Sequence, residues 1–206
     1  MVEAIKGQSR RALRENGTNM KKGNDYIKKT TIPGLYIIER PTFGDNRGHF
    51  REAFRVNELE EFAGIKFNPV QWNHSLSLPG VIRGLHAENW NKVLYPTTGK
   101  MNSYFVDIRE DSPSFGRIEL IEFNESKPRA VFVSKGIANS ICVIGNIPVH
   151  YFYLVDAYYD GKDTRAVAWD DPDLAIDWPI KNPVISERDK NNPSLRELFP
   201  EKFKKK

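Results

Sequence analysis

After Pro33-Gly34 the chain alternates short apolar runs with clusters of turn residues. Runs of four to eight β-branched and aromatic residues, bounded by Gly, Pro, Asn or Asp, are typical of β-strands. The clearest runs are Leu35–Ile38, Val93–Tyr95, Ser103–Val106, Ile118–Ile121 and Ala130–Val133. Many short strands with few helices predict an all-β fold, a jelly-roll sandwich or barrel.

Helical patterning is confined to a few places. Helices are expected at Val56–Phe62 and Leu195–Leu198. A further short helix is expected at Val2–Arg14, ending before Asn16-Gly17. Residues 1–30 hold too few apolar side chains to bury a core of their own and are interpreted as a basic extension. Residues 31–200 are expected to form one domain, followed by a basic tail at 201–206, with no internal repeat.

The run Val149–Val155 predicts which side chains share a face. Side chains alternate across a strand, so Val149, Tyr151, Tyr153 and Val155 point to one side, and His150, Phe152 and Leu154 to the other. Most tyrosines on such strands belong to the core. The pattern alone therefore does not separate a core tyrosine from a reactive one.

Length and composition favour a single catalytic domain. A chain of 206 residues is within the range of one β-sandwich. No apolar run reaches the roughly 18 residues of a membrane span, and the N-terminus lacks the apolar core of a signal peptide, so a cytoplasmic protein is expected. The single cysteine, Cys142, has no internal disulfide partner and is expected inside a strand.

The distribution of charge argues against nucleic acid as a partner. The net charge is +4, but residues 1–30 carry eight Lys/Arg against three Asp/Glu, and residues 201–206 carry four Lys against one Glu. Residues 31–200 therefore have a net charge of −4. A face that binds nucleic acid would concentrate Lys and Arg on the folded body.

Candidate chemistry gathers in the stretch Val81–Lys92, which contains Arg83-Gly84-Leu85-His86. Histidine side chains ordinarily titrate near pH 6.5, so a histidine can accept a proton at neutral pH. A nearby ammonium such as Lys92 can stabilise negative charge on an oxygen as that proton leaves. The combination suits proton abstraction next to a carbonyl, although the tetrapeptide alone would equally fit a strand end with a hydrogen-bonded histidine.

Several ordered blocks strengthen the catalytic interpretation. From about Gly34 to Leu195 the chain resembles the dTDP-4-dehydrorhamnose 3,5-epimerase family, cupin-fold enzymes that epimerise nucleotide-linked 4-keto sugars. The blocks that carry the resemblance are Phe43–Glu52, Gln71–Ser75, Gly80–His86, Val106–Arg109 with Ser112–Gly116, Trp169–Pro172, Ile176–Pro179 and Ser186–Asp189. Each block is weak by itself, but the ordered set is specific.

The resemblance implies a catalytic set. His86 corresponds to the base, Lys92 to the group that stabilises the enolate oxygen, and Asp189 to the carboxylate that orients the base. Tyr153 corresponds to the acid on the opposite face of the sugar, because it lies six residues before Tyr159, the second residue of a Tyr-Tyr pair. The implied reaction inverts C3, C5 or both in a 4-keto-6-deoxy sugar nucleotide.

The resemblance also implies substrate contacts. Arg47 and Arg83 correspond to arginines that bind the diphosphate, a role suited to a guanidinium. The other expected contacts to nucleoside, sugar or diphosphate are Phe50, Glu52, Gln71, Asn73, Asn139 and Tyr159. Family members are similar in exchanging N-terminal strands, so a homodimer is expected in which the stretch from Arg47 to Glu52 completes the partner's pocket.

Two departures from the family pattern change the charge expected in the pocket. Asn139 stands where a histidine is usual, and an asparagine does not titrate near neutral pH. Glu88 stands where a glutamine is usual, two residues after the base. These changes predict retained enolate chemistry with an altered substrate or altered regiochemistry, such as inversion of C3 alone or C5 alone.

Neither a metal nor a redox cofactor is expected, because His49, His74, His86 and His150 show no His-x-His or similar spacing. Two alternatives stay open at this point. One is an enzyme of another class on the same scaffold, such as a metal-dependent isomerase or oxygenase. The other is a non-catalytic cupin that binds a sugar nucleotide, for which Asn139 and Glu88 are the best argument.

Overall fold

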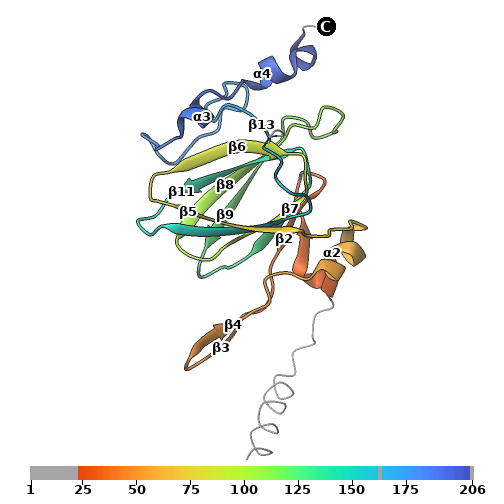
Figure 1. Cartoon of the computed structure of the whole chain (residues 1–206), viewed down its shortest axis with the longest axis vertical. Helices are drawn as coiled ribbons and strands as arrows, with labels where there is room; N and C mark the ends of the chain where they lie inside the picture. Colours follow the sequence, from red (N-terminus) through yellow and green to blue (C-terminus); the bar gives the residue numbers. More distant parts are fainter. Residues whose placement is uncertain (1–22, 162–163, 205–206) are drawn as a thin grey trace, which may run out of the picture.

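Two antiparallel sheets face each other in the computed structural model, which describes residues 23–161 and 164–204 (Figure 1). The six-stranded sheet runs in the order β1 (Ile27–Lys29), β2 (Leu35–Ile38), β10 (Ala130–Val133), β7 (Lys92–Pro96), β12 (Val149–Val155) and β5 (Gln71–Ser77). The five-stranded sheet runs in the order β13 (Thr164–Ala166), β6 (Ile82–Glu88), β11 (Ile137–Val143), β8 (Lys100–Asp107) and β9 (Ile118–Asn124). The expected all-β, cupin-type jelly-roll fold is confirmed.

Three apolar layers hold the sandwich together. Between the sheets lies a core that includes Leu94, Phe105 and Tyr151. Helix α2 (Val56–Ala63) covers part of the outer face of the six-stranded sheet, where Leu59 packs with Phe67 and Phe132. The outer face of the five-stranded sheet is covered by the C-terminal segment, which contains α3 (Glu187–Lys190), α4 (Leu195–Leu198) and the 3-10 helix η2 (Pro200–Phe203) (Figure 1).

The local patterns explain most of these elements. The predicted helices at Val56–Phe62 and Leu195–Leu198 are confirmed as α2 and α4, and α4 begins with a capping box between Ser194 and Glu197. In β12, Tyr151 is buried between the sheets while Phe152 lies on the outer face, which confirms the predicted alternation. Cys142 is fully buried in β11, as expected. No helix in the described part of the chain is long and apolar enough to cross a membrane.

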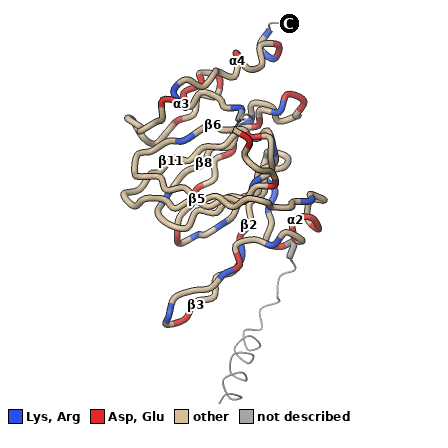
Figure 2. The backbone as a smooth tube through the Cα atoms, in the orientation of Figure 1, with Lys and Arg blue, Asp and Glu red and all other residues tan. Residues whose placement is uncertain are grey.

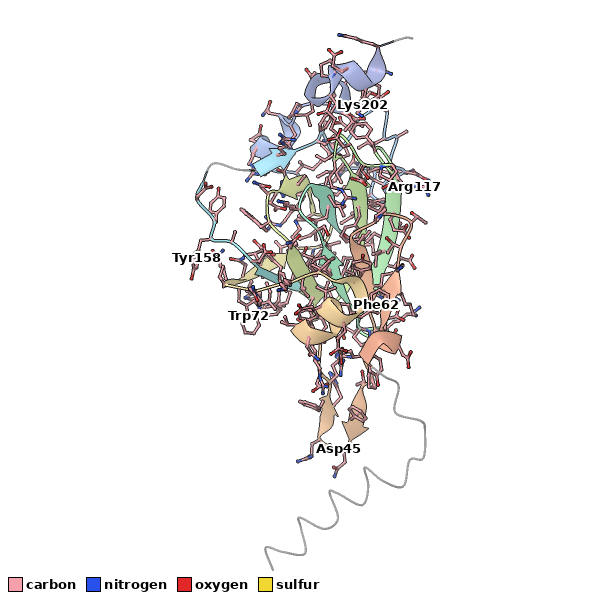
Figure 3. The ribbon with its side chains drawn as sticks, turned by 90° about the vertical axis from the view of Figure 1, so that its right-hand side faces the viewer. Asp45, Phe62, Trp72, Arg117, Tyr158 and Lys202 are labelled. Carbon is pink, nitrogen blue, oxygen red and sulfur yellow. The ribbon has the colours of Figure 1, made fainter. Side chains whose placement is uncertain are left out.

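The hairpin of β3 (Phe43–Asp45) and β4 (Gly48–Phe50) forms a separate two-stranded sheet. It extends away from the sandwich, with Asp45 near its tip (Figures 1 and 3). Phe43 and Phe50 are 56% and 67% exposed on it. We refer to residues 43–50 as the arm. In this chain the arm is a projection with little apolar cover.

The boundaries of the folded domain differ from the expected residues 31 and 200. The 3-10 helix η1 (Gly23–Tyr26) and β1 both lie within residues 1–30, and Ile27 is buried against α2 and β10, so the sheet begins before residue 31. At the other end, Lys202 lies over the ring of Phe115, so part of the expected tail packs on the body. The expected helix at Val2–Arg14 lies outside the described residues. Charges of both signs are interspersed on the visible face (Figure 2).

A buried carboxylate closes the turn after β8. Asp107 is fully buried and accepts hydrogen bonds from Arg109 Nε at 2.8 Å and from the hydroxyls of Ser112 and Ser114 at 2.5 and 2.6 Å. Burial raises the pKa of Asp107, but these donors outweigh burial and hold its pKa below the ordinary 3.8. The carboxylate therefore stabilises the fold in its ionised form.

Asp107→Asn is expected to lower the free energy of unfolding by about 2 kcal/mol, because the amide supplies one neutral acceptor where charged hydrogen bonds stood. A lowered folded pKa means that the wild-type advantage is complete above pH 3.8 and is lost as the pH falls through the folded value. Urea denaturation at pH 7 and at about pH 3 should show that the difference in unfolding free energy between the wild type and Asp107→Asn is smaller in acid. Asp111→Asn, at an exposed position of the same turn, is the control. A difference in unfolding free energy that is the same at both pH values would contradict the stabilising role of the ionised Asp107 carboxylate.

Candidate active site

A cavity of about 320 Å³ opens between the two sheets and is lined by side chains from both. Strands β5, β7 and β12 supply one wall, and β6 and β11 supply the other. Its lining residues are Gln71, Asn73, Ser75, Arg83, His86, Glu88, Trp90, Lys92, Asn139, Ile141, Tyr151, Tyr153, Tyr159 and Arg188. The cavity therefore brings together titratable groups that are far apart in the chain.

His86 in β6 is held by Asp189 from α3. The imidazole Nε2 lies 2.7 Å from Asp189 Oδ1, and Oδ2 of the same carboxylate accepts the backbone N–H of Gly84 at 3.1 Å. Ser186 caps α3 by accepting the N–H of Asp189, which fixes the start of that helix. Burial raises the pKa of Asp189, but its hydrogen bond and charge interaction with His86 outweigh burial and keep the pKa below 3.8. An ionised carboxylate thus contacts the ring at Nε2 and fixes its orientation.

Gly84 allows this arrangement because no side chain would fit there. Its backbone has φ +122°, and a Cβ would lie 2.7 Å from the carbonyl oxygen of Asn139 and 2.9 Å from Cα of Ser140. Both neighbours are parts of β11, which cannot withdraw easily. Gly84, two residues before His86, therefore lets β6 approach β11 closely.

Lys92 forms a buried ion pair with Glu88 inside the cavity. The ammonium hydrogen-bonds Oε2 of Glu88, and the two side chains are 5% and 15% exposed. Burial raises the pKa of Glu88, but the charge of Lys92, its hydrogen bond and the charge of His86 outweigh burial and leave the pKa below the ordinary 4.5. Glu88 is therefore ionised at neutral pH and lies in direct contact with the side-chain nitrogen of Lys92.

Tyr153 faces the cavity from β12, on the sheet opposite His86. Burial and then the negative charge of Glu88 raise the pKa of its phenol, while Arg83 acts in the opposite direction. Tyr151, two residues earlier on the same face, is buried, and its pKa is raised further by the same two causes. Both phenols keep their protons at neutral pH, as a proton donor must.

Two buried polar atoms of the cavity lining lack partners within the described part of the chain. They are Oδ1 of Asn139, an acceptor, and Nε1 of Trp90, a donor. Asn139 is 6% exposed and its amide nitrogen reaches the Tyr151 hydroxyl only at 3.5 Å. Because buried polar groups are ordinarily hydrogen-bonded, these atoms are suited to contact a polar ligand.

The structure brings most of the predicted site residues to this cavity. Its lining includes Gln71, Asn73, Arg83, His86, Lys92, Asn139, Tyr153 and Tyr159, and Asp189 lies directly behind His86. Arg47 and Phe50 lie on the arm instead, where Arg47 is paired with Asp45 at the surface. Glu52 is paired with Arg40 and Arg55 and does not line the cavity of its own chain.

Sequence reasoning missed four polar or aromatic residues that line the cavity: Ser75, Trp90, Tyr151 and Arg188. Period-two alternation is the signal that leads to Ser75 and Tyr151, which follow Asn73 and precede Tyr153 on the same strand faces. Arg188 is inside the block Ser186–Asp189 and adds a cation to the cavity. In the described residues, no three His, Cys, Asp or Glu side chains lie together as a set able to hold a metal ion.

Comparisons with known proteins show which family the chain is similar to. A family model described as dTDP-4-dehydrorhamnose 3,5-epimerase matches residues 29–197. The dTDP-4-dehydrorhamnose 3,5-epimerase of Shigella flexneri is 35% identical over 169 residues, covering 80% of this chain and 93% of that protein.

Two solved structures are also similar. The dTDP-6-deoxy-D-glucose-3,5-epimerase of Legionella pneumophila, in complex with dTDP-4-keto-L-rhamnose, is 33% identical with a TM-score of 0.79, covering 85% of this chain and 95% of that one. ChmJ, a 3'-monoepimerase from Streptomyces bikiniensis in complex with dTDP-quinovose, is 29% identical with a TM-score of 0.77, covering 83% and 89%.

Proposed function

The chain belongs to the dTDP-4-dehydrorhamnose 3,5-epimerase family and is an epimerase, and from this premise we propose that it inverts C3, C5 or both in a nucleotide-linked 4-keto-6-deoxy sugar. The observation that carries the proposal is the position of His86 and Tyr153 on opposing sheets across one cavity. A base and an acid on opposite faces of a ring are what inversion at a carbon requires. The proposal replaces the non-catalytic alternative.

In the proposed reaction, His86 Nδ1 takes the proton from the carbon next to the C4 ketone. The C–H electron pair moves into the ring and the carbonyl oxygen becomes an enolate oxygen. Lys92 stabilises that oxygen, an interaction that strengthens as the charge develops and therefore raises the rate. The enolate electrons then reform the carbonyl as the carbon takes a proton from the Tyr153 phenol on the opposite face, and exchange with solvent returns a proton to the tyrosinate and removes one from His86. Asp189 stabilises the imidazolium formed in the first step.

Substrate binding is proposed to use the cations and unpartnered atoms of the cavity. Arg83 and Arg188 line it together, and guanidinium groups bind phosphate oxygens with paired hydrogen bonds. Asn139 Oδ1 and Trp90 Nε1 are available for sugar hydroxyl or carbonyl groups. Asn139 lies across from His86 in the β6–β11 register, so we propose that it influences which carbon is inverted.

NMR in D₂O tests the proposal directly. Incubating the protein with the dTDP-linked 4-keto-6-deoxyglucose should replace hydrogen by deuterium at C3, C5 or both, because the enolate is reprotonated by groups in exchange with solvent. Following the two carbons separately shows which of them is deprotonated. Absence of deuterium at both C3 and C5, for this sugar and for its dTDP-linked 4-keto analogues, would refute the function.

We further propose a homodimer in which the arm reaches the partner's cavity. The arm, with Asp45 near its tip, projects from the sandwich (Figure 3), and the side chains of Arg47 and Phe50 on it are exposed. Next to an apolar hollow of about 220 Å³, lined in part by Phe54 and Phe152, Trp72 of the edge strand β5 is 71% exposed. Exposed apolar surface of this kind marks protein interfaces, and a two-fold pair is the commonest assembly.

Trp72→Glu is expected to raise the dimer dissociation constant by about 30-fold or more, the effect of losing an interface anchor worth about 2 kcal/mol. Light scattering coupled to size-exclusion over a dilution series measures the change. Leu120→Glu is the matched control, since Leu120 is 44% exposed on β9, away from this face. A wild-type protein that is monomeric and active at micromolar concentration would rule out the dimer.

A further inference from the structure

We propose that Glu88 is a positioning residue that holds Lys92 as an ammonium and Tyr153 as a neutral phenol, so that the enzyme stays active further into alkaline pH. The idea deepens the proposed function and depends on it for the roles of both groups. Its structural basis is the ion pair between Glu88 and Lys92 on the cavity wall.

The charges of Glu88 and Lys92 attract each other strongly because neither side chain is well solvated. Lys92 begins β7 and Glu88 ends β6, so the pair joins the two sheets at the cavity. With side chains 5% and 15% exposed, both ions have lost most of their water. An ammonium buried in this way without an anionic partner would lose its proton more easily. Glu88 is the carboxylate that supplies the partner.

The charge of Glu88 also reaches the two tyrosines across the cavity. It is the second cause, after burial, of the raised pKa of both Tyr151 and Tyr153. The other charged or titratable groups that face the pair are His86 and Arg83 from β6, Tyr159, and Arg188 from α3, with Asp189 behind His86. Arg83 opposes the effect on Tyr153, so Glu88 is the neighbour that favours the protonated phenol.

The effects of Glu88 on Lys92 and on Tyr153 have the same direction. Removing the negative charge makes the ammonium and the phenol give up their protons at lower pH. The proposed mechanism needs the first group charged and the second protonated, so activity would fail earlier as pH rises. Glutamine keeps the shape of the side chain and is the residue that the family resemblance predicts at this position. Glu88→Gln therefore changes the charge with little change in packing.

The first test compares pH profiles of deuterium exchange at the sugar carbons. For Glu88→Gln, the alkaline limb is expected to move to lower pH by about one unit, the usual size for a nearby charge. Glu122→Gln, an exposed carboxylate on β9 at the far edge of the five-stranded sheet, should leave the limb in place. A limb that does not move, or a loss of rate equal at every pH, would overturn the proposal.

A second test does not depend on turnover. Protein labelled with 3-fluorotyrosine gives ¹⁹F resonances, of which the Tyr153 signal is identified by its absence in Tyr153→Phe. Its titration midpoint should fall by about one unit in Glu88→Gln and stay unchanged in Glu122→Gln. An unchanged midpoint in Glu88→Gln would refute the role of Glu88 even in a protein that exchanges normally. A protein with no exchange at all would instead refute the proposed function.

Discussion

His86→Asn is expected to slow deuterium incorporation into the sugar ring by about 10³-fold, the usual contribution of a positioned general base. Asparagine keeps a polar side chain of smaller volume at this position, but its amide does not accept a proton near neutral pH. The variant is therefore expected to fold and to bind nucleotide. The rate is measured by NMR from the loss of the proton signals at C3 and C5.

His74→Asn provides the matched control, because His74 is exposed on β5, where it contacts His150 and Phe152 outside the cavity. It should exchange deuterium at the wild-type rate. Binding of dTDP to His86→Asn, followed by calorimetry, distinguishes lost chemistry from a lost site. A rate for His86→Asn within tenfold of wild type would exclude the histidine as the base.

Lys92→Met is expected to lower kcat by about 10² to 10³-fold, with a smaller effect on nucleotide affinity, because in the proposed reaction the ammonium stabilises charge that exists in the transition state. Methionine fills a similar volume without the charge. Exchange rates and dTDP binding measured on the same preparation give the two quantities. A near-normal kcat would remove lysine from the mechanism.

The interpretation of Lys92→Met needs one more variant, since the single change leaves Glu88 buried without its partner. In Lys92→Met/Glu88→Gln neither ion is present. Comparing the single and double variants separates loss of the ammonium from the presence of an unpaired carboxylate. If the double variant recovered the wild-type rate, the lysine would only be neutralising Glu88.

Periodicity predicted several of the strands and the helices at Val56–Phe62 and Leu195–Leu198 because these patterns are local properties. Leu35–Ile38, Ala130–Val133 and Val149–Val155 carry enough β-branched and aromatic residues to be identified without tertiary information. The 3-10 helix η1 and strand β1 were not identified, because Ile27 is an isolated buried residue in a polar stretch and its strand forms by pairing with β2. A local sequence pattern does not show which other strand a segment will pair with.

The candidate site was predicted mainly through family resemblance, and the structure adds what sequence order does not contain. The ion pair of Glu88 and Lys92 depends on how the chain turns between β6 and β7. Arg47, Phe50 and Glu52 were expected at the pocket, yet within one chain the arm carries the first two away from it. If the proposed dimer forms, their surroundings depend on a second molecule, and a single sequence does not describe those.

His86 and Tyr153 come from separate sheets, so the gap between them is determined by the apolar residues packed between those sheets, such as Leu94 and Phe105. A change of one methylene group in that layer alters the distance between proton acceptor and proton donor. Enzymes of this fold can therefore evolve new stereochemical outcomes by substitutions in the apolar core, at residues that do not contact the sugar. Every polar residue of the pocket can stay the same.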